Sequence, residues 1–369
     1  MGLLTTVSAS SVLAAGINVT SSADTTADDG VCTLREAITA ANTDTASGAL
    51  TGECAGGSGA DTITFSFAGT ITLSGLLPAI TTDLSISGAG AIIVSGDNAF
   101  RVFNVTAGFV ALSGLTITAG SVSGGGGGIF NTANLDITDS TISGNTAAGG
   151  GGGVWSSGWL GVGDSTISGN SSPGNGGGGI WSVGTLFVMN STISGNSGAL
   201  GGGLYNLGNL LMANSTISAN SATLSDGGLT AGGSETVVNS IVAGNTAPNS
   251  PEFGGDIDGG AVDSVIGVPA GMTLADILVP AGLADNGGPT QTIALALVAG
   301  NPAVDTGDAT CVEAPISLLD QRGMSRLPVC DIGAYEAQPP TLAAVADIAV
   351  SATSTAGAAV SFTSPVGTD

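Results

Sequence analysis

The sequence of 369 residues contains no histidine and no lysine, and its only basic side chains are four arginines. Against these stand 28 acidic residues, which give a formal net charge of −24. A surface of this charge repels nucleic-acid phosphates and anionic lipids, so we expect neither as a partner. Because histidine and the CxxC spacing are both missing, the composition also disfavours a zinc site.

Long apolar runs and helical patterns are scarce as well. No run of 18 apolar residues occurs, so we expect no membrane span in this chain. β-Branched residues dominate the apolar positions and 63 glycines interrupt every long run, which argues against helix. The glycines show no three-residue period, which excludes collagen, and a hydrophobic content of 42% excludes a disordered chain.

What the sequence does contain is a unit of about 25 residues with a serine-threonine-isoleucine-serine-glycine-asparagine core. Two other apolar segments keep the same step, so each unit supplies three short strands separated by Gly, Asn or Ser turns. A fixed period of this kind is the signature of a solenoid. The sequence therefore predicts an all-β, right-handed parallel β-helix with three sheets. The cores are Ser140–Asn145, Ser165–Asn170, Ser191–Asn196, Ser215–Asn220 and Ser240–Asn245.

One column of the repeat is aromatic. Its members are Phe130, Trp155, Trp181 and Tyr205. Because strand residues alternate in direction, the aromatic side chains point outward if the residues before them point inward. Those residues, which are the better inward candidates, are Ile129, Val154, Ile180 and Leu204. A stacked aromatic row suits sugar rings or a protein partner. We predict that this column is the binding surface, with Trp155 and Trp181 adjacent and partly exposed.

Two polar columns allow a structural interpretation beside a functional one. The asparagines that end the repeat cores are expected to have a structural role. Their side-chain amides would hydrogen-bond to one another along the axis, and asparagine tolerates a left-handed turn. Outward Thr/Ser rows resemble an ice-binding face, although any solvated β-face favours these residues. The rows are Thr116/Thr118, Thr141/Ser143, Thr166/Ser168, Thr192/Ser194 and Thr216/Ser218.

Candidates for catalysis are few. Asp139 and Asp164 stack one coil apart, either as a carboxylate dyad or as a turn column that later holds Asn190 and Asn214. A polysaccharide lyase needs a base and a group that neutralises a uronate carboxylate, and only arginine is present. Within the coils lies Arg101, whereas the other three arginines fall in end-cap motifs, at Arg35, Arg322 and Arg326.

The cap arginines are expected to hold loops by pairing with carboxylates, for instance Arg322 with Asp320 or Asp331. We therefore predict no catalytic residue. The expected function is an adhesive or structural rod that binds a glycan or another surface protein, with self-association as a further hypothesis. The alternative is a polysaccharide lyase or hydrolase, and ice binding is a third hypothesis.

Metal binding is left open. Two acidic segments supply oxygen ligands that suit calcium, but neither matches an EF-hand or nonapeptide motif. We therefore favour solvated loop charge as their explanation, with calcium as the alternative, and no other cofactor is expected. The segments are Asp24–Asp29 and the group Asp256, Asp258 and Asp263.

The chain ends carry cysteines and one helical pattern. Four cysteines allow three pairings, and we predict the local one, Cys32–Cys54 with Cys311–Cys330. Such bridges indicate an oxidising compartment. Within Ala27–Asn42, Thr33 and Glu36 form a capping box before one apolar helical face, made by Leu34, Ala37, Ile38 and Ala41. We expect this helix to cover the open end of the β-helix.

These ends resemble known families. VCTLREAITAAN at Val31–Asn42 with DTITF at Asp61–Phe65 resembles the N-terminal module of CSLREA-domain proteins, which are secreted bacterial surface proteins. The segment Leu283–Asp308, with DQRGMSR at Asp320–Arg326 and CDIGAYE at Cys330–Glu336, resembles the choice-of-anchor Q region. The resemblance implies a pectate-lyase-like β-helix in a secreted or cell-surface protein. It implies no reaction, because the fold hosts enzymes and adhesins.

The expected domain organisation follows from these segments. Residues 1–16 are expected to be a signal-peptide remnant, 17–60 the N-terminal cap, 61–270 the β-helix and 271–337 the C-terminal cap. Residues 338–369 read as a proline-containing linker and the beginning of a hyalin-repeat (Ig-like) module that is incomplete here.

Overall fold

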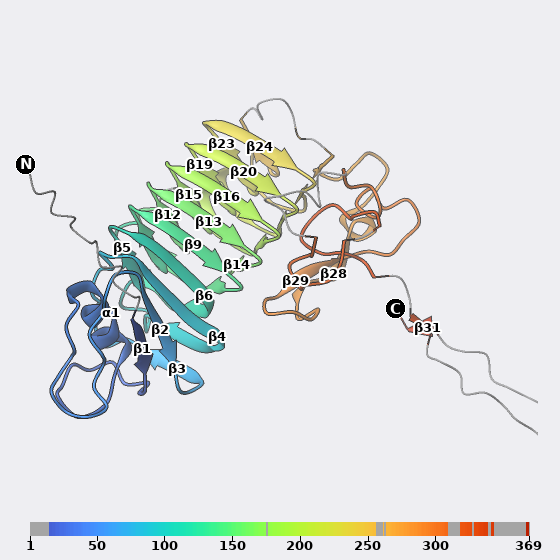
Figure 1. Ribbon diagram of the computed structural model, residues 1–369. Helices are drawn as coiled ribbons and strands as arrows, with labels where there is room; N and C mark the ends of the chain where they lie inside the picture. Colours follow the sequence, from blue (N-terminus) through green and yellow to red (C-terminus); the bar gives the residue numbers. More distant parts are fainter. Residues whose placement is uncertain are drawn as a thin grey trace, which may run out of the picture. The chain divides into compact units, whose positions relative to one another are not determined.

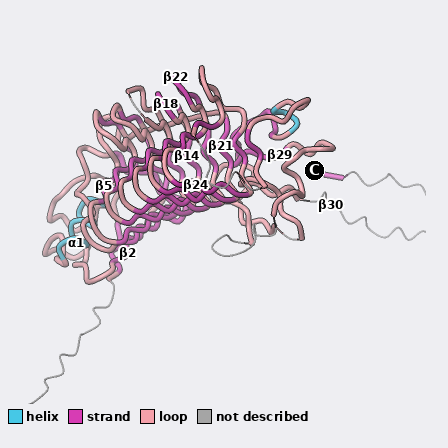
Figure 2. Tube along the Cα trace, turned by 90° about the horizontal axis from the view of Figure 1, so that it is seen from above, coloured by secondary structure: helices cyan, strands magenta, loops and turns pink. Residues whose placement is uncertain are grey.

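The computed structural model describes residues 15–174, 176–255, 261, 263–308, 318–326, 328–338, 341–342 and 367–368. Residues up to Glu336 form one compact unit, and the residues from Ala337 onward form a second. The first unit is a parallel β-helix of about 8 turns, spaced about 25 residues apart, so the predicted β-helix is confirmed (Figure 1). Figure 2 shows the coils stacked between α1 (Leu34–Thr43) and the C-terminal segment that contains β29.

The largest sheet has 16 strands and forms two of the three faces. It begins with β1 (Gly16–Val19), β2 (Asp61–Phe65), β3 (Gly69–Thr72), β4 (Leu84–Ser95) and β6 (Phe109–Thr118). The first half of β6 pairs with β9 (Asn134–Thr138) and its second half with β10 (Thr141–Ser143), so the chain turns a corner within β6. One face continues through β13 (Trp159–Gly163), β16 (Thr185–Met189), β20 (Asn209–Ala213) and β24 (Ser234–Val238). The other continues through β14 (Thr166–Ser168), β17 (Thr192–Ser194), β21 (Thr216–Ser218), β25 (Ile241–Val242) and β27 (Val265–Ile266).

The third face is a seven-stranded parallel sheet. Its strands are β5 (Phe103–Val105), β8 (Ile129–Asn131), β12 (Val154–Ser156), β15 (Ile180–Ser182), β19 (Leu204–Asn206), β23 (Leu229–Ala231) and β26 (Phe253–Gly254). Two short parallel pairs lie between the faces: β7 (Ser121–Val122) with β11 (Thr146–Ala147), and β18 (Ser197–Leu200) with β22 (Ser221–Ser225).

The remaining elements follow the coils. Within the first unit, η1 (Leu274–Asp276) precedes an antiparallel pair, β28 (Leu278–Ala284) with β29 (Thr292–Leu295). In the second unit, β30 (Thr341–Leu342) pairs with β31 (Gly367–Thr368).

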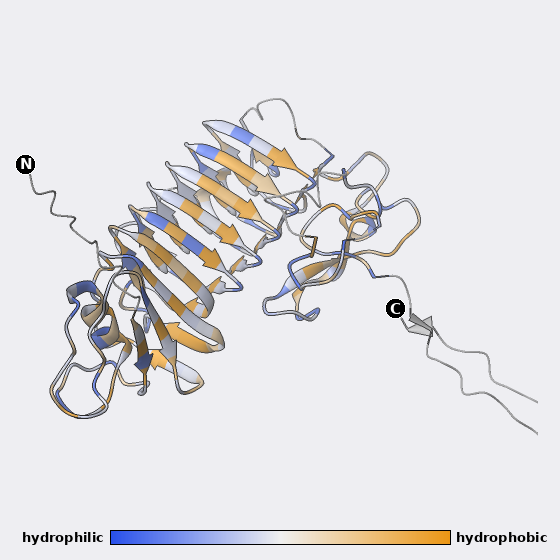
Figure 3. Ribbon diagram, in the orientation of Figure 1, coloured by the Kyte–Doolittle hydropathy of each residue, from blue (hydrophilic) through white to orange (hydrophobic). Residues whose placement is uncertain are grey.

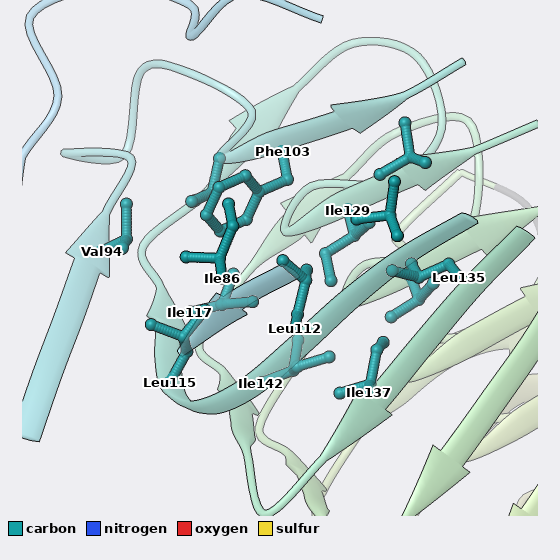
Figure 4. Close-up of a cluster of buried hydrophobic side chains, with 14 of the residues drawn as sticks. Ile86, Val94, Phe103, Leu112, Leu115, Ile117, Ile129, Leu135, Ile137 and Ile142 are labelled. Atoms are coloured by element: carbon teal, nitrogen blue, oxygen red, sulfur yellow. The ribbon is translucent and has the colours of Figure 1, made fainter. Parts of the chain in front are cut away.

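The repeat places equivalent residues directly over one another. Ile142 lies between Ile117 and Ile167 in the parallel register, and all three side chains are buried. Figure 4 shows such inward aliphatic side chains meeting from different strands. The isoleucines of the repeat cores therefore point inward. One apolar core therefore runs through the coils.

A ladder of asparagines also lies inside the coils. Asn145, Asn170, Asn196, Asn220 and Asn245 are buried, and each Nδ2 donates to the Oδ1 of the next asparagine at 2.9 Å. The ladder ends where Asn245 Nδ2 donates to Glu252 Oε2 at 2.8 Å. The predicted structural role is confirmed. The predicted left-handed asparagine is wrong, because the preceding residue takes that conformation, for example Gly144 at φ 64°.

The N-terminal cap has the predicted form. Thr33 is the N-cap of α1, and its capping box with Glu36 is complete. The predicted apolar helical face is buried in the same core as the coils. A disulfide joins Cys32 to Cys54, as predicted. Cys311, the predicted partner of Cys330, lies outside the described residues, so that bridge remains a prediction.

The C-terminal segment forms a second apolar core with the last coils. In this core Ile277, Ile293 and Ile332 cluster with Ile241 and Val265. Ile241 and Val265 continue the outward column of Thr216, so the core covers the outer side of these coils.

The asparagine ladder yields a first prediction. Asn196→Ala removes the hydrogen bonds of Asn196 to Asn170, Asn220 and the Ile167 carbonyl, and leaves buried partners unpaired. We expect the free energy of unfolding in urea to fall by about 3–5 kcal/mol, since each buried unpaired group costs about 1–3 kcal/mol. The control is Asn209→Ala, at an exposed strand position, which should change stability by less than about 0.5 kcal/mol. Equal effects of the two variants would show that the ladder does not hold the coils together.

Candidate functional site

The four predicted aromatic residues form one row on the seven-stranded sheet. Trp155 pairs in register with Phe130 on one side and with Trp181 on the other, and Trp181 pairs with Tyr205. All four side chains are partly exposed. The predicted adjacency and partial exposure of Trp155 and Trp181 are therefore confirmed.

The rings contact one another in two pairs. Phe130 and Trp155 stack with their centroids 4.5 Å apart and their planes 5° apart. Trp181 and Tyr205 meet edge to face, with centroids 5.5 Å apart and planes at 83°. Both geometries are favourable for aromatic pairs. The row thus consists of two ring pairs in adjacent coils, and within each pair part of the ring surface is occupied by the neighbouring ring.

The glycine runs between the strands pack against the two tryptophans. A Cβ added at Gly125 would lie 2.9 Å from Trp155 Cδ1, and one added at Gly176 would lie 2.4 Å from Trp181 Cε3. The Trp181 Nε1 is buried and has no hydrogen-bond partner among the described residues. Alanine at either tryptophan would therefore remove packing against the backbone as well as exposed ring surface.

Arg101 extends the row at its N-terminal end. Its guanidinium lies 4.8 Å from the Phe130 ring centroid and donates to the carbonyls of Gly125 and Gly126 at 2.8 and 2.9 Å. Within the described part of the chain it forms no ion pair. Desolvation lowers the pKa of Arg101. Its contacts thus hold the glycine loop and the first ring in place.

The glycine packing gives a second prediction. Gly176→Ala should cost about 2–5 kcal/mol, since a left-handed residue with Cβ costs about 1–2 kcal/mol and a displaced ring adds about 1–3 kcal/mol. Gly90→Ala is the matched control, because Gly90 has a similar φ (+74° against +64°) with open space around its Cβ position. Thermal unfolding and tryptophan fluorescence should separate the two variants. An unchanged emission spectrum in Gly176→Ala would contradict the ring contact.

The later Thr/Ser rows are covered by the C-terminal segment. Thr166, Thr192 and Thr216 are buried. Thr192 Oγ1 donates to Gln321 Oε1 at 2.6 Å, and Gln321 Nε2 donates to Thr166 Oγ1 at 3.0 Å. These hydroxyls bind the protein itself, which disfavours an ice-binding face over these coils.

Two arginines hold the covering segment together. Both Nε and Nη2 of Arg322 donate to Asp320 Oδ2, and its guanidinium lies 3.6 Å from the Tyr335 ring centroid. This confirms the predicted pairing with Asp320. Arg326 is fully buried and pairs with Glu336 at 3.4 Å. Arg326 also reaches the coils, where its Nη2 donates to Asn190 Oδ1 at 3.3 Å.

The supposed carboxylate dyad belongs to a column of left-handed turns. Asp139 and Asp164 have φ near 50°, and so do the residues at the same place in later coils, Asn190, Asn214 and Asn239. Asp and Asn are the side chains that tolerate this conformation best. The Asp164 carbonyl also accepts a hydrogen bond from Thr290 of the C-terminal segment. Backbone geometry therefore accounts for the column, and this favours the turn interpretation over the dyad.

Two carboxyl groups under the C-terminal segment have raised pKa values. Burial, followed by the charge of Asp139, raises the pKa of Asp164 to about 6. Burial raises the pKa of Glu336 to about 7. Both groups bind protons more tightly in the folded protein than in the unfolded chain. Below about pH 4, Asp164 and Glu336 therefore make their full contribution to the free energy of unfolding. This contribution is lost as the pH rises through 6 to 7.

This pH dependence gives a third prediction. Asp164→Asn places at this turn the residue found in the next coils, so we expect it to fold normally. Removing a carboxylate whose ionisation is unfavourable should raise the free energy of unfolding by about 1–2 kcal/mol at pH 7.5 and hardly at all at pH 4. Urea unfolding at both pH values measures this. Asp97→Asn, at an exposed left-handed turn, is the control and should show no such difference. An equal increase in the free energy of unfolding at both pH values would rule out the ionisation of Asp164 as the cause.

The predicted calcium ligands are only partly described. Asp256 and Asp258 lie outside the described residues. Asp24 is paired with Arg35 through both carboxylate oxygens, at 2.9 and 2.6 Å. No group of three or more acidic or cysteine side chains in the described ranges is arranged to hold a metal ion. Among the same residues, no helix has the length and hydropathy to cross a bilayer.

A second aromatic cluster was missed in the sequence. It lies on the face of β9, β13 and β16 and comprises Asp136, Trp159 and Phe187. The alternation of Leu135, Asp136 and Ile137 did mark Asp136 as outward. The column was overlooked because its members differ from coil to coil, so no repeated residue type marks it.

Comparison of the chain with protein-family models, with curated proteins and with solved structures finds no match. The resemblance of the two ends to CSLREA-domain and choice-of-anchor Q proteins therefore stays a prediction. Arguments about function rest on the geometry described above.

Proposed function

We propose that this protein is an extracellular, non-catalytic β-helix module that binds an extended ligand, a glycan or a partner protein, along the aromatic row. The observation that carries the proposal is the row itself: four aromatic side chains, one per coil, in register and partly exposed. At about 4.8 Å per coil the row is about 15 Å long, which suits an extended ligand. The Cys32–Cys54 disulfide supports an extracellular place, since disulfides persist in oxidising compartments.

The surroundings of the ionisable groups support a non-catalytic role. The buried Arg322 and Arg326 join parts of the C-terminal segment, and Arg35 is bound to Asp24. Arg101 holds a glycine loop. Asp164 lies in a turn column in contact with the C-terminal segment. General acid–base catalysis needs a titratable group placed against the substrate, and these groups serve structural contacts instead.

The fourth prediction tests the row with substitutions that the fold already contains. Asn104 precedes Phe130 in the aromatic column and Thr230 follows Tyr205. Phe130→Asn and Tyr205→Thr therefore shorten the row from either end with residues that this position accommodates. We expect each variant to weaken the best ligand on a glycan array about three- to tenfold and the double variant more strongly, because each aromatic contact contributes about 0.5–1.5 kcal/mol. Undiminished binding by the double variant would contradict the row as the binding surface.

A cleavage assay decides between this proposal and a polysaccharide lyase. The protein should release no unsaturated product from pectate or alginate, with or without calcium. Ultraviolet-absorbing products that disappear in Arg101→Ala would overturn the non-catalytic proposal. The release of reducing ends without unsaturation would instead indicate a hydrolase.

A further inference from the structure

The cluster of Asp136, Trp159 and Phe187 lies on a different sheet from the aromatic row. Asp136 of β9, Gly161 of β13 and Phe187 of β16 occupy one column, in register on three consecutive strands. Trp159 is on the same strand as Gly161, two residues earlier, and is 38% exposed. In Figure 3 the strands of this face show hydrophobic segments beside hydrophilic ones. The column therefore places a carboxylate and an aromatic ring on either side of a glycine.

The glycine shapes the space between them. A Cβ added at Gly161 would lie 2.5 Å from Asp136 Oδ1 and 2.8 Å from Trp159 Cη2. The indole thus lies across Gly161 with its six-membered ring close to the carboxylate. The Phe187 ring centroid is 5.6 Å from that of Trp159, and the planes are tilted by 39°. A larger residue at position 161 would displace the indole or the carboxylate, so glycine is what lets them converge.

Two hollows open at this point. One, of ≈ 280 Å³, is lined by Asp136, Trp159, Phe187 and Met189, among others. The other, of ≈ 300 Å³, shares Asp136 and Trp159 and extends to Phe109. Apart from Asp136 the first hollow is lined by apolar and glycine residues. The first hollow can therefore contact a small group through aromatic and thioether surface, with a single negative charge, that of Asp136, at the edge of the hollow.

The charge of Asp136 is not compensated by the protein. Among the described residues its carboxylate takes part in no ion pair, and none of the four arginines lines either hollow. Asp136 is exposed at the edge of the hollow, and partial desolvation by the neighbouring side chains raises the pKa of its carboxyl group. A bound cation would offset that unfavourable environment, because an opposite charge favours the ionised form.

We infer that this hollow binds the alkylammonium group of a small molecule, of the size of tetramethylammonium or choline. The ammonium charge lies against Asp136, and the methyl groups contact Trp159, Phe187 and Met189. Aromatic faces attract such cations through the ring quadrupole, with tryptophan the strongest, and thioethers pack well against apolar groups. The net charge of −24 raises the local concentration of any cation.

The lining favours a cation over a sugar. A sugar ring presents several hydroxyl groups and needs several hydrogen-bond partners. The first hollow offers one carboxylate beside rings, a thioether and glycine backbone. A tetraalkylammonium ion needs no hydrogen bond and gains from each of these contacts. This inference does not depend on the aromatic row of the seven-stranded sheet.

The test is a titration of the intact protein with choline, followed through the indole N–H signals of its three tryptophans by NMR. Trp159→Phe assigns the signal of Trp159. We expect choline to move that signal with saturation, and the neutral analogue 3,3-dimethylbutanol to bind at least about tenfold more weakly, since it keeps the shape and lacks the charge. Asp136→Asn should weaken choline binding about tenfold or more. Asp97→Asn, which changes the net charge equally, should leave it unchanged within about twofold.

Several outcomes would overturn the inference. If choline in large molar excess over the protein moves no indole signal, the hollow does not bind alkylammonium ions. Equal binding of the neutral analogue would make it an apolar pocket. A shift of the Trp159 signal by neutral oligosaccharides instead of choline would make it a sugar site. If Asp97→Asn weakens choline binding as much as Asp136→Asn does, then the net charge of the protein alone attracts choline.

Discussion

The hydrogen bond between stacked asparagine amides is the interaction on which this architecture depends. Each amide in the ladder donates to the coil that follows, and its oxygen accepts from the coil before. A buried amide without these partners would be costly, so every coil must present its asparagine at the same height and angle. This requirement fixes the register between coils more strictly than apolar packing does, because packing tolerates small shifts.

Fixed register converts a sequence period into surface rows. Since equivalent residues lie directly over one another, four aromatic residues in successive units become a stacked strip on the seven-stranded sheet. The glycine runs belong to the same constraint. Gly125 and Gly176 approach the tryptophan rings so closely that any side chain would collide with them. The abundance of glycine in this chain thus reflects close approach of backbone to aromatic rings as well as turn geometry.

The features set by the period could be predicted from the sequence, whereas contacts between distant segments could not. The repeat gave the parallel coils, the inward isoleucines, the asparagine ladder and the aromatic row, and the Thr33–Glu36 capping box gave the helix. Nothing in the pattern indicated that Gln321 would lie over Thr166 and Thr192, because that contact joins a unique segment to the repeat. The Asp136 cluster escaped for the opposite reason. Asp136 and Phe187 stand in one column with Gly161, and Trp159 stands two residues before Gly161. These residues differ in type, so only the paired strands bring their chemistry together.

The C-terminal segment decides which surfaces can serve a ligand. It occupies the hydroxyl rows of β14, β17 and β21, and Arg326 anchors it to Asn190 with a guanidinium that is fully buried. Breaking this contact would leave a buried guanidinium N–H without its partner on the coils, which costs about 1–3 kcal/mol, and this contributes to holding the segment over these coils. The aromatic side chains lie on the other two faces, at Trp155 on one and Trp159 on the other. These two sets differ in a way that bears on their ligands: the first is a neutral strip that ends at an arginine, and the second surrounds a carboxylate. One coil geometry thereby presents two surfaces of opposite electrostatic preference, and a single ligand is not expected to suit both.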